Sequence, residues 1–226
     1  MTITLVLLAQ KVRAQSQFEL GAVLGGTTPT SVAPWLTAIF TDITPGRVSL
    51  MLQSHLDVAS EFIGEVALNL NPSFNPTSLT FLQINGAPLQ GAPSLSANGI
   101  RLAGAGNLGV GFDVLLSWPT ANGRGRLNGT ETVSFEISGP ANLMASDFDF
   151  FNTVNGPAGE AIIGAHIQGI PVGSGTGGSG AVIQLIPEPS VVVLFVMAIA
   201  TVGVGQTYRA RRGPGGCARR ATGILQ

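Results

Sequence analysis

Hydrophobic and polar residues alternate along much of this chain with a period of two. In the stretch ETVSFEIS, Val133, Phe135 and Ile137 fall on one side of an extended backbone, and polar residues fall on the other. Such alternation is typical of a β-strand with one buried face. An amphipathic pattern with a period of 3.6 residues is not sustained anywhere before residue 190. The sequence therefore predicts an all-β body.

The same pattern recurs in segments that turn residues separate. We expect strands at 35–42, 47–54, 61–69, 78–84, 111–118, 131–138, 145–152 and 161–169. Asn-Gly pairs, which favour tight turns, occur at 85–86, 98–99, 122–123 and 155–156. Many short alternating strands favour an antiparallel β-sandwich over residues 15–186, with the jelly roll as one of its forms.

Two of these strands carry specific expectations about which side chains are buried. In the strand 111–118, four apolar residues are expected on one face: Phe112, Val114, Leu116 and Trp118. In the strand 145–152, aromatic residues are expected to point inward and acids outward: Phe148 and Phe150, against Asp147 and Asp149.

The Gly/Ser-rich stretch at 171–180 has two interpretations. It is either a flexible spacer before the C-terminal segment, or a long loop before a final edge strand in AVIQLI, residues 181–186. The sequence leaves both open.

The charges are few and unevenly placed. Charged residues make up 10% of the chain, whose formal net charge is −1, against about 25% in an ordinary globular domain. Residues 15–186 hold four basic and eleven acidic residues, a formal charge of −7. An acidic body repels phosphate backbones, which argues against nucleic acid as a partner.

The N-terminal residues 1–14 are predicted to be a signal peptide. An apolar stretch runs from Ile3 to Ala9, and Val12 and Ala14 supply small residues for cleavage after Ala14. A basic segment is expected before such a stretch, and one explanation for its absence is that the signal peptide begins upstream of Met1. The alternative is that these residues are a disordered or strand-like N-terminus. A signal peptide at this position would direct export of the domain that follows it.

Near the C-terminus, residues 191–208 form an uncharged stretch that Arg209, Arg211 and Arg212 follow. As a helix, these 18 residues span about 27 Å, just below the thickness of a hydrocarbon core of about 30 Å. Basic residues after an apolar helix are typical of its cytoplasmic end. We therefore expect a C-terminal hydrophobic helix in the membrane.

The four residues before this stretch are Pro187, Glu188, Pro189 and Ser190. Prolines flanking an acid hold the backbone extended, which suits recognition by a protease. These residues, the apolar stretch and the arginines at 209–212 together resemble a PEP-CTERM sorting signal over 187–212, with a basic tail at 213–226. The resemblance implies a bacterial protein that an exosortase, a membrane-embedded cysteine protease, processes for the cell surface or the extracellular space.

The body also resembles ectodomains that are often attached to PEP-CTERM signals. The likeness rests on PWLTAIFTD, EFIGEVALNLNPSFNPTSLTF and GAHIQGI, in this order before a Gly/Ser loop. Those ectodomains have no assigned activity, so the resemblance implies no reaction and no ligand.

Candidate catalytic residues are few. His166 shares a strand face with Gln168, and it is a candidate ligand or general base. Ser54, His55 and Asp57 are too close in sequence for a catalytic triad, whose members converge from separate elements. No catalytic residue is therefore assigned.

Paired acids offer a second kind of chemistry. Asp147 with Asp149, and Glu61 with Glu65, are spaced to share a strand face, as glycosidase carboxylates can. The alternative for the first pair is a calcium site with Asn152, since calcium prefers oxygen ligands. The favoured interpretation is solvated acids without a metal or cofactor.

From the sequence we expect a non-enzymatic protein of the cell envelope or extracellular matrix, with an exosortase and the membrane as partners. The alternatives are a carbohydrate-binding module for extracellular polysaccharide on the same anchor, and a hydrolase. Exposed aromatic residues would favour carbohydrate binding, and Trp35 and Trp118 are the candidates.

Overall fold

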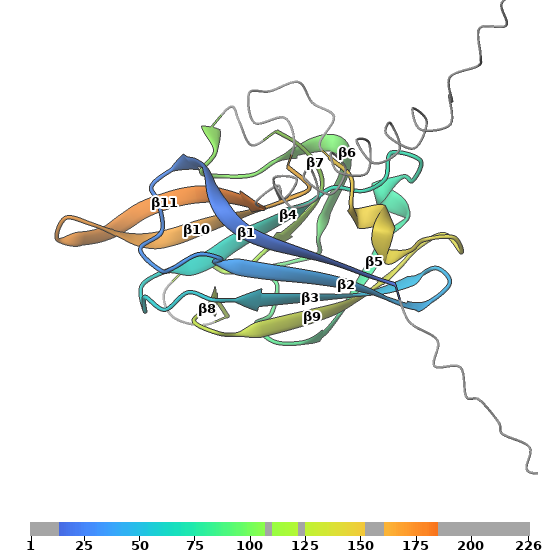
Figure 1. Ribbon diagram of the computed structural model, residues 1–226, viewed down its shortest axis with the longest axis horizontal. Helices are drawn as coiled ribbons and strands as arrows, with labels where there is room; N and C mark the ends of the chain where they lie inside the picture. Colours follow the sequence, from blue (N-terminus) through green and yellow to red (C-terminus); the bar gives the residue numbers. More distant parts are fainter. Residues whose placement is uncertain (1–13, 107–109, 122–124, 152–160, 185–226) are drawn as a thin grey trace, which may run out of the picture. The chain divides into compact units, whose positions relative to one another are not determined.

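The computed structural model in Figure 1 describes residues 14–106, 110–121, 125–151 and 161–184. The chain divides into two units, residues 1–185 and 186–226. All the described residues lie in the first unit, to which the following account applies.

Antiparallel strands make up just over half of the described residues, and no α-helix occurs among them. The strands are β1 (Gln15–Gly26), β2 (Leu36–Thr44), β3 (Arg47–Ser54), β4 (Phe62–Leu68), β5 (Thr80–Asn85), β6 (Ser94–Arg101), β7 (Val110–Ser117), β8 (Leu127–Asn128), β9 (Thr132–Ser138), β10 (Ile163–Val172) and β11 (Gly175–Gln184). Two short 3-10 helices accompany them, η1 (Pro76–Ser78) and η3 (Ala145–Phe148). The prediction of an all-β antiparallel fold is confirmed.

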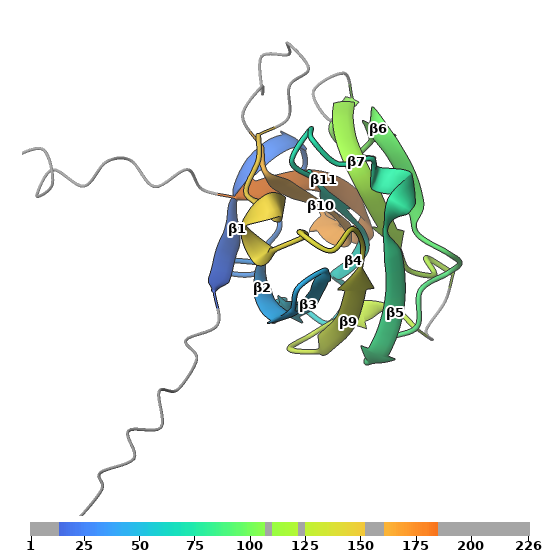
Figure 2. The same ribbon diagram turned by 90° about the vertical axis from the view of Figure 1, so that its right-hand side faces the viewer.

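Hydrogen bonds join the strands into one continuous sheet. Its order is β5-β9-β3-β2-β1-β11-β10-β4-β7-β6, and β8 pairs with β4 beside β7. The sheet curls strongly, as Figure 2 shows, so that its concave side encloses the main core. The sequence suggested a sandwich of two sheets, whereas the backbone pairing shows a single curled sheet.

The main core is built from the inward side chains of most strands. The alternation predicted for the strand at 131–138 is confirmed, because Val133, Phe135 and Ile137 are buried in this core. Burying a large apolar side chain stabilises a fold by about 1.5–3 kcal/mol. Side-chain burial therefore explains why the alternating stretches form strands.

A second, smaller hydrophobic cluster covers the opposite face of the sheet. Val66 and Ala67 are consecutive in β4, yet Val66 belongs to the main core and Ala67 to the second cluster. Ile100 and Leu102, from β6 and the segment after it, also belong to the second cluster. We call this opposite face of β4, β10 and β11 the outer face.

The expectation for the strand at 111–118 is correct for three of its four apolar residues. Val114, Leu116 and Trp118 lie in the main core, whereas Phe112 lies in the second cluster. The pairing of β6 with β7 shifts register next to Phe112. A register irregularity turns neighbouring side chains to different faces, which explains the exception.

The prediction of a strand at 145–152 is wrong, because η3 occupies Ala145–Phe148. The Asp147 carboxylate accepts a hydrogen bond from the Met144 amide at 2.8 Å and caps this turn. The Asp42 carboxylate accepts another from the Ala145 amide at 2.6 Å. The turn is thus fixed by Asp147, which the sequence pattern placed on an open strand face, and by Asp42 of β2.

The Gly/Ser-rich stretch is neither a spacer nor a long loop. Residues 171–180 belong to the hairpin of β10 and β11, and β11 begins within the glycines at Gly175. Moreover, β11 is not an edge strand, because it pairs with β1 on one side and β10 on the other. Its first glycines, Gly175 to Gly178, pair with β10 alone, so backbone pairing with one neighbour overrides the low strand preference of glycine.

Candidate functional site

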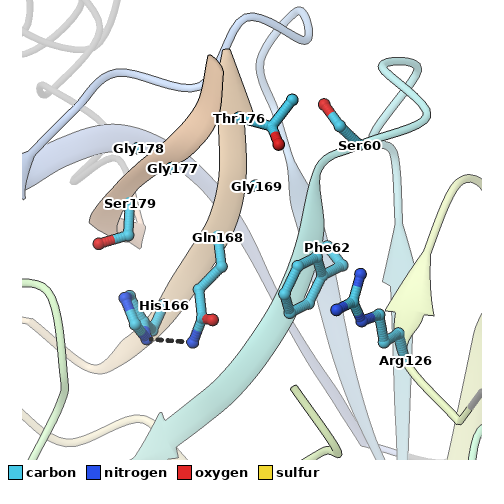
Figure 3. Close-up of a pocket in the computed structure, with 10 residues that line it drawn as sticks. All are labelled: Ser60, Phe62, Arg126, His166, Gln168, Gly169, Thr176, Gly177, Gly178 and Ser179. Atoms are coloured by element: carbon cyan, nitrogen blue, oxygen red, sulfur yellow. Dashed lines mark hydrogen bonds between the residues drawn. The ribbon is translucent and has the colours of Figure 1, made fainter. Parts of the chain in front are cut away.

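A polar pocket opens on the outer face, where β11, β10, β4 and β8 follow one another in the sheet. Its volume is about 490 Å³. The backbone of glycines in the β10–β11 hairpin forms part of the wall (Figure 3). The side chains in the wall include Ser60, Phe62, Arg126, His166, Gln168 and Ser179.

The alternation of β10 directs two polar side chains to the outer face. Ile163, Ala165 and Ile167 point into the main core. His166 and Gln168 therefore point the other way and reach the pocket (Figure 3). The sequence prediction that these two residues share a strand face is confirmed by their hydrogen bond.

His166 is a buried histidine, and only one of its two ring nitrogens has a hydrogen-bond partner among the described residues. Its Nδ1 lies 3.1 Å from the amide nitrogen of Gln168, and its Nε2 is buried without a hydrogen-bond partner among the described residues. With the Gln168 amide as the donor, Nδ1 accepts and the neutral ring carries its hydrogen on Nε2. Burial lowers the pKa of His166 below its ordinary value of 6.5, and the negative charge of Glu65 opposes part of that shift. His166 is therefore neutral at pH 7.

A glycine makes room for this ring. Gly104 has a φ of +77°, and a Cβ placed there would lie 2.6 Å from Cδ2 of His166. Such a distance is far below van der Waals contact, and this φ is unfavourable for other residues. Gly104 thus allows the turn after β6 to cover the histidine closely.

Arg126 supplies the positive charge of the pocket. Its guanidinium carbon lies 3.9 Å from the centroid of the Phe62 ring, a cation–π contact. The guanidinium also donates a hydrogen bond to the carbonyl oxygen of Thr120. These two contacts fix the orientation of the side chain, which Figure 3 shows beside Phe62.

Unpaired polar atoms are concentrated at this pocket. Among the described residues, three buried side-chain atoms have no hydrogen-bond partner: Asn69 Oδ1, Arg126 Nε and His166 Nε2. Two of the three belong to residues that line the pocket. Buried polar groups are nearly always paired in folded proteins, so unpaired ones indicate a missing partner.

Ser54, His55 and Asp57 do not form a catalytic triad, in agreement with the sequence analysis. The Nε2 atom of His55 lies 2.9 Å from the Thr37 hydroxyl. The buried Ser54 hydroxyl accepts a weak hydrogen bond of 3.5 Å from the Leu56 amide. Both side chains therefore serve local structure.

Glu61 and Glu65 do not form a carboxylate pair, contrary to the shared face that their spacing predicts. Glu61 precedes β4, is completely buried, and accepts hydrogen bonds from Thr30 and Ser31. Glu65 stands opposite His166 in the sheet and accepts one from the Ala103 amide at 3.0 Å. The two carboxylates hold different loops.

The candidate calcium ligands also have other partners or lie outside the described residues. Asp147 accepts hydrogen bonds from the Met144 amide and, at 2.9 Å, from the side-chain amide of Asn71. Asp149 follows η3, and Asn152 lies outside the described residues. Within the part of the chain that the structure describes, no three His, Cys, Asp or Glu residues are grouped as metal ligands.

Both tryptophans are structural. Trp35 and Trp118 are buried in the main core. Their indole N–H groups donate to the carbonyl oxygens of Ser31 at 2.6 Å and Ala87 at 3.0 Å. Neither ring is available to stack on a sugar.

The predicted signal peptide, apart from Ala14, lies outside the described residues. So do the sorting residues Pro187, Glu188, Pro189 and Ser190, the apolar stretch at 191–208 and the arginines at 209, 211 and 212. Where the chain is described, none of its helices has the length and apolar character needed to span a bilayer.

Comparison with known proteins gave no match. No protein-family model, curated protein or solved structure is significantly similar to this chain.

Sequence reasoning identified His166 and Gln168 but missed Arg126 and the glycine-lined wall. Arg126 follows the predicted turn at 122–123 and belongs to no expected strand. Its position comes from the pairing of β8 with β4, which places Asn128 opposite Phe62. The available signal was that Arg126 is one of four basic residues in an acidic body.

Proposed function

We propose that this is an exported, non-enzymatic protein of the cell envelope or extracellular matrix, sorted by an exosortase. The observation that carries the proposal is the order of parts at 187–212: a Pro-Glu-Pro-Ser sequence, an uncharged stretch and an arginine cluster. Residues 191–208 would form the helix that anchors the protein in the membrane before processing. The mature protein would then reside at the cell surface or outside the cell.

The boundaries of the sheet support this proposal. The first strand begins at Gln15, directly after the expected signal-peptide cleavage site. The last of the described strands ends at Gln184, before Pro187. Cleavage at either proposed position would therefore remove none of the strands that the structure describes.

The surroundings of His166 support a role without catalysis. Its Nδ1 is paired with an amide, whereas a catalytic histidine is usually oriented by a carboxylate or a backbone carbonyl. The nearby Glu65 carboxylate accepts a hydrogen bond from the Ala103 amide. These contacts favour binding over acid–base chemistry.

Intact-mass analysis of the protein from its native host tests the sorting proposal. We expect a mature chain that ends near Pro187–Ser190. A variant with Pro187, Glu188 and Pro189 replaced by alanine should keep its C-terminal segment, and a Pro214→Ala control should be processed normally. A wild-type chain that still carries Arg209–Arg212 would mean a plain membrane anchor and would contradict the proposal.

The polar pocket favours a second candidate function, a carbohydrate-binding module on the same anchor. Its wall offers an amide, hydroxyls, an imidazole and a guanidinium, groups that recognise sugar hydroxyls. Because the tryptophans are buried, binding would rest on hydrogen bonds rather than on stacking. Retention of the protein on immobilised polysaccharides would support this function, and retention on none of them would refute it.

A further inference from the structure

The unpaired atoms in the pocket wall indicate the chemistry of a ligand. Arg126 Nε always carries a hydrogen, and His166 Nε2 carries one when its Nδ1 accepts from Gln168. Both atoms are then buried donors without an acceptor. Neither atom is accessible to solvent, and a Cβ at Gly104 would lie 2.9 Å from His166 Nε2. A ligand that pairs with them must therefore displace the groups that cover them and supply acceptor oxygens.

The charge of the pocket indicates an anionic ligand. Arg126 is the one charged residue in the described wall, and no acidic residue lines it. Among the described residues, the ion pair found is Arg47 with Glu136, on another part of the sheet. The guanidinium of Arg126 is held against Phe62 and has no carboxylate as its partner. An arginine fixed in this way is prepared to bind a carboxylate with two parallel hydrogen bonds.

The remaining wall indicates a hydroxylated ligand rather than a bare anion. Gln168 lies opposite Ser179 in β11 and opposite Phe62 in β4. From β8 to β11 the wall crosses three strand spacings, about 14 Å at about 4.8 Å each. Gln168 and Ser179 belong to β10 and β11, whereas Arg126 directly precedes β8 at the other end of this path (Figure 3). A ligand that uses the full wall needs hydroxyl groups as well as a carboxylate.

We propose that this pocket binds a carboxylated sugar unit, a hexuronate, with its carboxylate on Arg126 and its hydroxyls along Gln168, His166 and Ser179. This inference rests on the proposed carbohydrate-binding function and specifies its ligand. One arginine matches the single negative charge of a uronate. The strongly acidic body, with a formal charge of −7 over residues 15–186, disfavours a densely charged polyanion.

The test is an NMR titration of the full-length protein in mild non-ionic detergent, with glucuronate as the probe and glucose as the neutral comparison. We expect glucuronate to bind more tightly than glucose. Replacing Arg126 with Gln should weaken glucuronate binding about 10- to 100-fold, as expected for the loss of a charge-assisted contact. The Arg47→Gln control removes the same charge from an exposed ion pair and should bind normally.

A second variant tests the pocket without touching its polar groups. A Cβ at Gly177 would meet nothing within 4 Å, and its φ lies outside the range that strains other residues. The Gly177→Leu variant should therefore fold like the wild type while its side chain obstructs the pocket wall. We expect it to lose glucuronate binding, and undiminished binding would overturn the assignment to this pocket.

The outcomes separate this inference from the proposal beneath it. Equal binding of glucose and glucuronate would overturn the role of the carboxylate but leave a carbohydrate-binding module. Acetate or phosphate binding as tightly as glucuronate would overturn the sugar part. Binding of neither sugar would overturn the hexuronate inference, and failure on polysaccharides as well would remove the carbohydrate-binding function. The sorting proposal does not depend on any of these results.

Discussion

Replacing Glu61 with alanine tests whether this buried acid has a structural role. Its carboxylate accepts hydrogen bonds from the Thr30 amide at 2.5 Å, the Ser31 amide at 3.2 Å and the Ser31 hydroxyl at 2.5 Å. The Ser31 hydroxyl in turn accepts from the amides of Asp57 and Val58. Glu61 thus fixes the loop between β1 and β2 against the turn before β4.

The cost of the change follows from the groups left unpaired. A buried donor that loses its acceptor costs about 1–3 kcal/mol. The Ser31 amide is buried, whereas Thr30 is exposed and can recover a bond to water. We therefore expect Glu61→Ala to lower the free energy of unfolding by about 2–4 kcal/mol. At a urea dependence of about 2 kcal/mol per M, the midpoint falls by about 1–2 M.

Urea denaturation followed by circular dichroism measures this loss. The matched control is Glu136→Ala, which also removes one acid but breaks an exposed ion pair with Arg47. Exposed pairs contribute about 0–1 kcal/mol, so the control should unfold near the wild-type midpoint. Equal midpoints for the two variants would refute the buried network around Glu61.

Three further predictions concern other contacts of the fold. Gly106 has a φ of +58° and open space around it, so Gly106→Ala should lower the free energy of unfolding by about 1 kcal/mol. Gly104→Ala also places a Cβ against the His166 ring and should lower it by about 2–4 kcal/mol. Thermal denaturation measures both losses. The lowered pKa of His166 means that the unfolded chain takes up a proton more readily. The contribution of neutral His166 to stability is therefore complete above about pH 6.5 and is lost as the pH falls through the lowered folded pKa. Urea midpoints measured down to about pH 5 should decrease less for His166→Gln than for the wild type. Leu50→Ala in the main core should cost about 2–5 kcal/mol, and Leu82→Ala, at a side chain that is 58% exposed, less than about 0.5 kcal/mol; equal costs would contradict the burial pattern.

Local patterns in the sequence predicted the strands whose two faces differ. In β3, Val48, Leu50 and Leu52 are buried while the residues between them are more exposed, so alternation alone identifies the strand. The same logic failed at 145–152, because an alternation of acids and aromatics also fits a capped turn. There the capping hydrogen bond of Asp147 decides the structure, and a period of two does not reveal it.

The pocket could not be predicted because it depends on pairing between distant segments. Arg126 and His166 are forty positions apart, and β8, β4 and β10 bring them to one face. The start of β11 was hidden by its glycines, which pair with β10 without burying side chains, whereas Ala181 and Val182 further along the strand are buried. Which strands pair is a property of the whole core, which no short window contains.

The unpaired donors of the pocket have an energetic consequence that links binding to stability. Each buried donor without an acceptor costs about 1–3 kcal/mol, so Arg126 and His166 destabilise the free domain. A ligand that supplies acceptors removes that cost and stabilises the folded state by mass action, by about 2.7 kcal/mol at a hundred times its dissociation constant. Glucuronate should therefore raise the urea midpoint of the wild type, and at the same concentration it should raise that of Arg126→Gln by much less. A structural explanation of the two donors would predict no such difference, because a purely structural pocket gains nothing from an added carboxylate.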